Sequence, residues 1–422
     1  MVAMSNVRLG RLRRVALDVA PLQTASYRRL WMAESVSAIG VQLTAVAVAI
    51  QVFDLTGSSL WVGALGAVGF VPLVVLGLWG GSVADAVDRR RLILVAATCG
   101  WVCTLGLLVN ELTGLHSLTL LLLLVAVQSG AFAVSQPALN AVIPRLLEPR
   151  LVPAANTLAF TTFNAATVVG PLFASFLLHI GGYGVAYGGD ALLFTAMLYA
   201  VVRLPPIEPT GHTSSPGLRS VLDGLQFIGT RPVLLLSFVI DIIAMVFAMP
   251  RAMFPQAAAE WFGGKQYAGW LYAAIALGAV LGGLSSGWIG RVRRQGLALV
   301  AAVVGWGLAV AAAGLARTLW LAVVLLAVAG AADLVSAVYR QTLLQVYAPD
   351  EMRGRMQGVF TVVVAGGPRL GDLRAGASVA GFGLAGAWVG GGLVCAVLVV
   401  VLVALAPALR RYTAVQRDTV TP

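Results

Sequence analysis

Residues 80–91 read Gly80-Gly81-Ser-Val-Ala-Asp85-Ala-Val-Asp88-Arg89-Arg90-Arg91, and this stretch decides the fold because it recurs in altered form 202 residues later. There the chain reads Gly282-Gly283-Leu-Ser-Ser-Gly287, and Arg291 follows at the offset that Arg89 has in the first copy. The second copy carries Gly287 in place of Asp85. The two halves of the chain therefore resemble each other, with one acidic position lost in the second.

Two further pairs of segments support an internal repeat. Gln136-Pro-Ala-Leu lies eight residues before Pro144, as Gln341-Thr-Leu-Leu lies eight residues before Pro349. Gly170-Pro171 and Gly367-Pro368 recur late in corresponding apolar runs. A six-helix unit repeated in parallel orientation is typical of one class of secondary transporter.

The composition places the chain in a membrane. Of its 422 residues, 59% are hydrophobic and only 11% are charged, whereas a soluble domain has about a quarter charged residues. The first 29 residues are Arg-rich and the first apolar run is too long for a signal peptide, so none is expected. The three cysteines all lie in apolar segments, which predicts neither a disulfide framework nor a metal site: Cys99, Cys103 and Cys395.

Twelve apolar runs are long enough to cross a bilayer, which takes about 20 residues. We place them at 29–53, 60–84, 92–110, 117–142, 153–179, 184–203, 232–256, 267–290, 297–315, 319–347, 355–381 and 383–406. The sequence thus predicts an all-α membrane protein of two six-helix bundles. The N-terminal bundle comprises 1–203, a cytoplasmic linker with a short amphipathic helix comprises 204–231, and the C-terminal bundle and tail comprise 232–422.

The arginines orient this topology. Cytoplasmic loops should carry the excess of Lys and Arg. With both termini in the cytoplasm, 22 of the 28 basic residues lie inside and two, Lys265 and Arg317, lie outside. The other four fall within spans: Arg251, Arg340, Arg369 and Arg374. This pattern explains the net charge of +11 by membrane orientation, so no nucleic-acid partner is expected.

The loop after the second span resembles the signature of the major facilitator superfamily, in which Gly, three residues and Asp are followed by Gly and two basic residues. Gly81 and Asp85 match it, whereas Asp88 stands where the family usually has Gly. In the family this cluster stabilises the outward-facing state. The resemblance implies that this gating motif comprises Gly81, Asp85, Asp88, Arg89, Arg90 and Arg91.

A second motif lies in the fifth span, where Gly170-Pro171 and the small residues after it look like a degenerate form of the family's antiporter motif. Proline bends a helix and small residues let a neighbour approach. An ordinary kinked packing helix is the alternative. Three other stretches are similar to the enterobactin-exporter and multidrug-efflux branch of this family: Gly269 to Gly278, Arg251 to Pro255 and Gly371-Asp372. That branch implies export in exchange for protons, from a bacterial cytoplasmic membrane, by a monomer.

Ionisable residues within spans are costly and are therefore candidate functional groups. In the implied fold the first, fourth, seventh and tenth helices line a central cavity. We propose Glu34, Asp241 and Asp333 as proton-coupling carboxylates. Candidates for the substrate cavity are Gln128, Gln136, Asn140, Arg251, Arg340, Arg369 and Asp372. Spacing places Asp333 and Arg340 on one helix face and allows Arg369 to pair with Asp372; structural ion pairs are the alternative. Asp190 is expected to cap the sixth helix.

No enzyme motif is visible. The sequence holds neither a phosphate-binding Gly-x-x-x-x-Gly-Lys loop nor His-Glu-x-x-His. We expect a secondary active exporter of a small amphipathic molecule, a siderophore or a drug, without a cofactor or metal. A proton-independent carrier, an uptake carrier and a membrane sensor that kept the fold are the alternatives.

Overall fold

The computed structural model describes residues 18–205, 225–347, 353–406, 408–410 and 412; the side chains of 78–86, 353–362 and 365 are outside the description. Within the described residues the chain is helical and holds no strand. Ten helices there are long and apolar enough to cross a membrane. The twelve crossings and the cytoplasmic termini stay predictions.

The first half contains five long helices, α2 (Ala25–Thr56), α3 (Ser59–Ala86), α4 (Arg89–Leu112), α5 (Leu118–Leu146) and α6 (Val152–Val202). The short 3₁₀ helices η1 (Ala20–Gln23) and η2 (Pro149–Leu151) precede α2 and α6. Within α6, Gly181 and Gly182 leave helical geometry, and Gly182 has a φ of 69° that favours glycine. This break falls where we predicted the gap between the fifth and sixth spans.

The second half repeats the pattern, with the long helices α8 (Pro232–Phe247), α10 (Ala268–Leu284), α11 (Gln295–Leu315), α12 (Leu319–Tyr347) and α13 (Arg353–Leu405). Shorter helices join them: η3 (Arg251–Met253), α9 (Phe254–Trp261), η4 (Lys265–Tyr267) and η5 (Ser286–Arg291). Gly383 breaks α13 at a φ of 68°, where we expected the division between the last two spans.

Two predicted spans are not single α-helices over their whole length. The seventh was placed at 232–256, but α8 ends at Phe247. Pro250 has no N–H to continue the helix and disfavours helical geometry at the residue before it. The eighth was placed at 267–290, but α10 ends at Leu284 and a 3₁₀ helix follows. The glycines and serines at 282–287 are weak helix formers, which accounts for this change.

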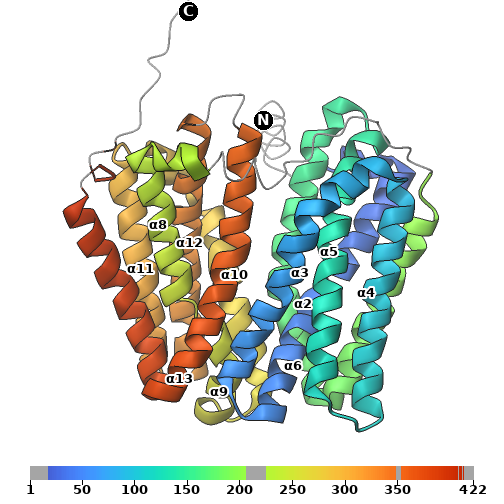
Figure 1. The fold of residues 1–422 in the computed structure, drawn as a ribbon, viewed down its shortest axis with the longest axis horizontal. Helices are drawn as coiled ribbons and strands as arrows, with labels where there is room; N and C mark the ends of the chain where they lie inside the picture. Colours follow the sequence, from blue (N-terminus) through green and yellow to red (C-terminus); the bar gives the residue numbers. More distant parts are fainter. Residues whose placement is uncertain (1–17, 206–224, 348–352, 407, 411, 413–422) are drawn as a thin grey trace, which may run out of the picture.

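The helices form two groups that lie side by side, blue to green and yellow to red in Figure 1. In the first group α2 packs on α6 and α3 on α5; in the second α10 packs on α12 and α11 on α13. The main contacts between the groups are α3 with α13 and α6 with α10. We call the end where α2 meets α3 at Gly57 the outer end and the opposite one the inner end, following the predicted orientation.

Candidate functional site

A buried ion pair joins α8 to α12. Asp241 on α8 pairs with Arg340 on α12, and these residues are only 1% and 5% exposed. Asp333 lies on the same side of α12, with 3.9 Å between its Oδ1 and Nη2 of Arg340, and its side chain is 45% exposed. The predicted shared face of Asp333 and Arg340 is confirmed. Two carboxylates thus share one guanidinium, one shielded and one accessible.

A second group of charges lies where η3 meets α13. Asp372 on α13 is half-buried, accepts a hydrogen bond from the backbone N–H of Ala252, and interacts electrostatically with Arg251 and Arg369. Arg251 also interacts with Asp333. It belongs to η3 and is exposed, so its predicted place inside the seventh helix is wrong, for the reason that Pro250 ends that helix. Arg251 therefore links the two charged groups.

Arg374, also within α13, has a structural role. Its guanidinium donates to the backbone carbonyls of Val246 and Phe247 at 2.9 and 2.5 Å. The last carbonyls of α8 have no partner within that helix, and Arg374 satisfies two of them. This contact fixes the end of α8 against α13.

The polar candidates of the first half do not gather in one place. Glu34 on α2 is half-buried, and its carboxylate forms no ion pair with the described residues. Gln136 is half-buried and Asn140 exposed on α5. Gln128 donates instead to Thr104 on α4 at 3.3 Å. Gln128 therefore belongs to a cluster centred on a different residue.

That residue is Asp190, whose predicted capping role is wrong. It is fully buried and lies eight residues beyond the break at Gly182, well inside a helical segment. Its Oδ2 accepts hydrogen bonds from the hydroxyls of Thr44 and Thr104 at 2.6 and 3.2 Å. The only sequence feature that indicated a buried role for Asp190 was its place in an apolar run, because its threonine partners are far away along the chain.

The gating motif shows helix capping in its described part. Asp88 accepts hydrogen bonds from the backbone N–H groups of Arg90 and Arg91 and so caps α4. Arg90 donates at 2.6 Å to the carbonyl of Val202, at the end of α6. Arg89 is buried, whereas Arg91 is exposed. The surroundings of Gly81 and the side chain of Asp85 lie outside what the structure describes.

The Gly170-Pro171 segment joins the two groups of helices. A Cβ on Gly170 would lie 3.0 Å from the carbonyl oxygen of Ile39 on α2. One turn further, the Ser175 hydroxyl accepts a hydrogen bond from the backbone N–H of Gly269 on α10 at 3.1 Å. The segment thus contacts its own bundle on one side and the other bundle on the other.

The second half repeats this arrangement in α13. A Cβ on Gly367 would lie 3.0 Å from Cβ of Met245 on α8, within the same bundle. A Cβ on Gly376 would lie 2.8 Å from the carbonyl carbon of Ser59 on α3, in the other bundle. The internal repeat therefore extends to the contacts between the bundles.

A polar cluster at the outer end strengthens this contact. Lys265 on η4 forms an ion pair with Asp54 on α2 and lies 4.9 Å from the ring centre of Tyr183. The Tyr183 hydroxyl donates to the same carboxylate at 2.6 Å. Nearby, Ser59 and Gln256 form a 2.6 Å hydrogen bond between the bundles. The sequence analysis did not predict this cluster. The one feature that could have indicated it is that Lys265 is the only lysine in the chain.

The contacts between the two bundles that are described above share one location. The contacts between the bundles at Gly63, Ser175, Ser59 and Lys265 all lie in the outer half, near the turns at Gly57 and Gly182. Among the described residues, no group of three or more His, Cys, Asp or Glu could hold a metal ion.

The sequence matches known proteins over most of its length. The family described as transmembrane secretion effectors matches residues 16–421. The enterobactin exporter EntS of Citrobacter koseri is 32% identical over 391 residues, which cover 87% of this chain and 91% of that protein. The EntS of Shigella boydii serotype 18 shows the same identity and coverage.

The fold also matches solved transporter structures at low sequence identity. The nucleoside transporter NupG superposes with a TM-score of 0.74 at 15% identity, over 92% of this chain and 99% of that one. A bacterial homologue of the iron transporter ferroportin, in an inward-facing state, gives 0.69 at 15% identity, over 90% and 98%. These likenesses show a shared fold.

Proposed function

Because the chain belongs to the transmembrane secretion effector family of the major facilitator superfamily, we propose that it exports a small amphipathic molecule from the cytoplasm. It is a multi-pass protein of the bacterial inner membrane. The 32% identity to enterobactin exporters over most of both chains is the observation that carries this proposal. The substrate classes that it favours are siderophores and drugs.

The proposed mechanism is alternating access. In the proposed cycle, the contacts between the bundles at the outer half, including the Lys265–Asp54 ion pair, belong to the state that is closed to the outside. Rocking of the bundles about the centre would break these contacts and close the inner end. In this mechanism the substrate enters from the cytoplasm in the described state and leaves after the outer contacts separate.

We propose proton exchange as the driving reaction, with Glu34, Asp241 and Asp333 as the carriers. Asp333 is the accessible partner of Arg340, whereas Asp241 is shielded. Protonation of either carboxylate would remove its attraction for the guanidinium and let α8 and α12 change their contact. Glu34, which has no ion pair among the described residues, offers a carboxylate that can take a proton without breaking one.

Transport in everted membrane vesicles tests both steps. Vesicles with the protein should accumulate a labelled siderophore or drug when a pH gradient is imposed, and nigericin should abolish the accumulation. Asp241→Asn, Glu34→Gln and Asp333→Asn are compared with Glu148→Gln, which removes an exposed carboxylate outside the predicted spans. Full proton-linked transport by all three test variants would refute the assignment of the carriers.

The same assay separates the alternatives. A proton-independent carrier would move substrate at the same rate with or without nigericin, without concentrating it in response to the pH gradient. An uptake carrier would move substrate in the opposite direction, and a sensor would bind substrate without moving it.

A further inference from the structure

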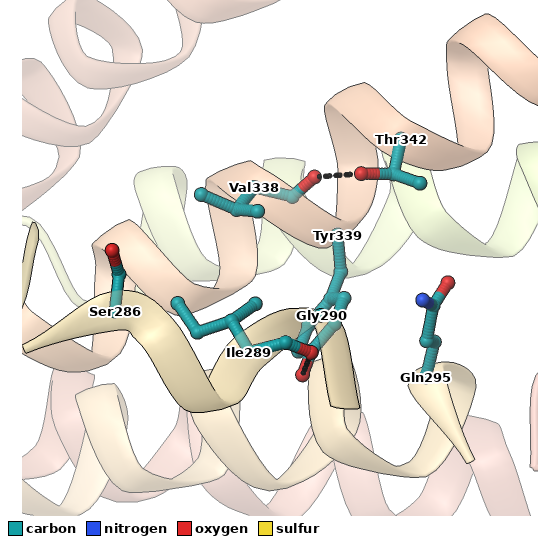
Figure 2. Close-up of a pocket in the computed structure, with 7 residues that line it drawn as sticks. All are labelled: Ser286, Ile289, Gly290, Gln295, Val338, Tyr339 and Thr342. Atoms are coloured by element: carbon teal, nitrogen blue, oxygen red, sulfur yellow. Dashed lines mark hydrogen bonds between the residues drawn. The ribbon is translucent and has the colours of Figure 1, made fainter. Parts of the chain in front are cut away.

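A pocket of 310 Å³ lies at the inner end of the second bundle, between η5, the start of α11 and α12. Ser286, Gln295 and Thr342 supply polar groups to its wall, and Ile289 and Val338 supply apolar surface (Figure 2). It opens on a different face of α12 from Arg340, since the lining residues Val338 and Thr342 are each two positions from Arg340 and point in a nearly opposite direction around the helix. The pocket is therefore separate from the buried charges described above.

The polar groups of this pocket are only partly used. The Thr342 hydroxyl donates to the carbonyl of Val338 at 2.8 Å and can still accept a hydrogen bond. Tyr339 donates to the carbonyl of Ile289 at 3.0 Å. Ser286 and Gln295 make no side-chain hydrogen bond to the described part of the chain, so their hydroxyl and amide groups can donate to a ligand.

Three exposed arginines flank the pocket. Arg291 follows the lining residue Gly290, and Arg293 and Arg294 directly precede Gln295. None of the three forms an ion pair with the residues that the structure describes. Arg150, by contrast, is an exposed arginine that pairs with Glu148 at 2.6 Å.

Comparison of the two repeats shows that the second has lost two acidic positions close to these arginines. At the offset that relates Arg89 to Arg291, Asp85 corresponds to Gly287 and Asp88 to Gly290. In the first half the Asp88 carboxylate accepts two backbone N–H bonds at the start of α4. In the second half both carboxylates are missing, and Gly290 lines the pocket. By sequence offset, the pocket thus lies next to a position where the second repeat has lost a carboxylate.

We propose that this pocket binds the headgroup of an anionic phospholipid, whose phosphate replaces the missing carboxylates. The arginines would attract the phosphate, and Ser286 and Gln295 would donate to its oxygens. Ile289 and Val338 would contact the first part of the acyl chains. Basic pockets between membrane helices bind anionic lipid headgroups in this way. A free phosphate ion would satisfy the polar groups but would leave the apolar wall uncovered.

Lipid retention by the purified full-length protein tests the proposal. The wild type is incubated with phosphatidylglycerol, phosphatidylcholine or inorganic phosphate, and bound lipid is counted by native mass spectrometry alongside the thermal unfolding midpoint. We expect one retained phosphatidylglycerol and a raised midpoint, with no effect of phosphatidylcholine or inorganic phosphate. The triple variant Arg291→Gln/Arg293→Gln/Arg294→Gln should bind roughly 100-fold more weakly, at about fivefold per arginine.

Two variants make the test specific to the pocket. Gly290→Asp restores the carboxylate of the first repeat, and a Cβ there meets no atom within 4 Å, so the fold should tolerate it. It should abolish lipid retention, whereas Arg150→Gln, which removes an arginine already paired with Glu148, should leave retention unchanged. Wild-type retention by both Gly290→Asp and the triple variant would overturn the proposal. So would an equal midpoint rise with inorganic phosphate.

Discussion

Gly63→Ala should shift the protein from the described state towards one that is open at the outer end. Gly63 on α3 faces the backbone of α13, where an added Cβ would lie 2.9 Å from the carbonyl carbon of Asp372 and 3.0 Å from Cα of Leu373. Carbon atoms pack best at about 3.5–4.0 Å, so α3 and α13 would have to separate by roughly 0.5–1 Å. The atoms in the way belong to the backbone and cannot move aside by rotation.

The size of the effect follows from this overlap. Extra methyl groups in tight contacts cost about 1–3 kcal/mol. If the outer contact exists in only one state, the whole cost falls on that state and changes the ratio of the two states by about 5- to 150-fold. Distances between spin labels at Arg145→Cys and Val346→Cys, exposed near the inner ends of α5 and α12, report this ratio. Opening of the outer end should shorten them.

Two glycines serve as controls. Gly77→Ala on the same helix places its Cβ 3.9 Å from Ala133 and should change nothing. Gly278→Ala places its Cβ 2.5 Å from the carbonyl carbon of Ala327, within one bundle, and should lower thermal stability without changing the label distances. If Gly63→Ala behaves like Gly278→Ala, the contact of α3 with α13 is permanent and the proposed gate is wrong.

Three further changes test other contacts. Asp241→Asn leaves the buried Arg340 without its main partner and should lower the free energy of unfolding by about 3–5 kcal/mol, whereas the double variant Asp241→Asn/Arg340→Gln should recover much of that loss. Thermal unfolding in detergent measures both variants, and an equal loss of stability in the two would contradict the pairing. Thr44→Val should cost about 1–3 kcal/mol by removing the 2.6 Å bond to Asp190, and Thr44→Ser should restore it in the same assay. Lys265→Met removes a half-exposed ion pair and should change the ratio of the two states, as reported by the label distances, by a few-fold at most, and by less at high salt. A change as large as that of Gly63→Ala would show that the ion pair, and not the contact of α3 with α13, dominates the stability of the described state.

The boundaries of the helices show where sequence reasoning worked. The run at 319–347 agrees with α12 at both ends, because apolar length and flanking polar residues are local properties of the chain. The seventh span lies within an apolar stretch that can cross a membrane, but it is not one α-helix, because Pro250 interrupts the run and α8 ends before it. The break at Gly383 was correctly placed.

The sequence by itself determined the apolar helices, the repeat of the two halves and the family, since each depends on residue type and spacing along one dimension. Only the tertiary structure decided which charges meet. Asp241 pairs with Arg340, and Asp190 with Thr44 and Thr104, across helices that are distant in sequence. A helix that is apolar all round can turn any face to its neighbours, so hydropathy does not specify those partners. Packing of glycines between helices and the need to pair each buried charge fix the rotation instead.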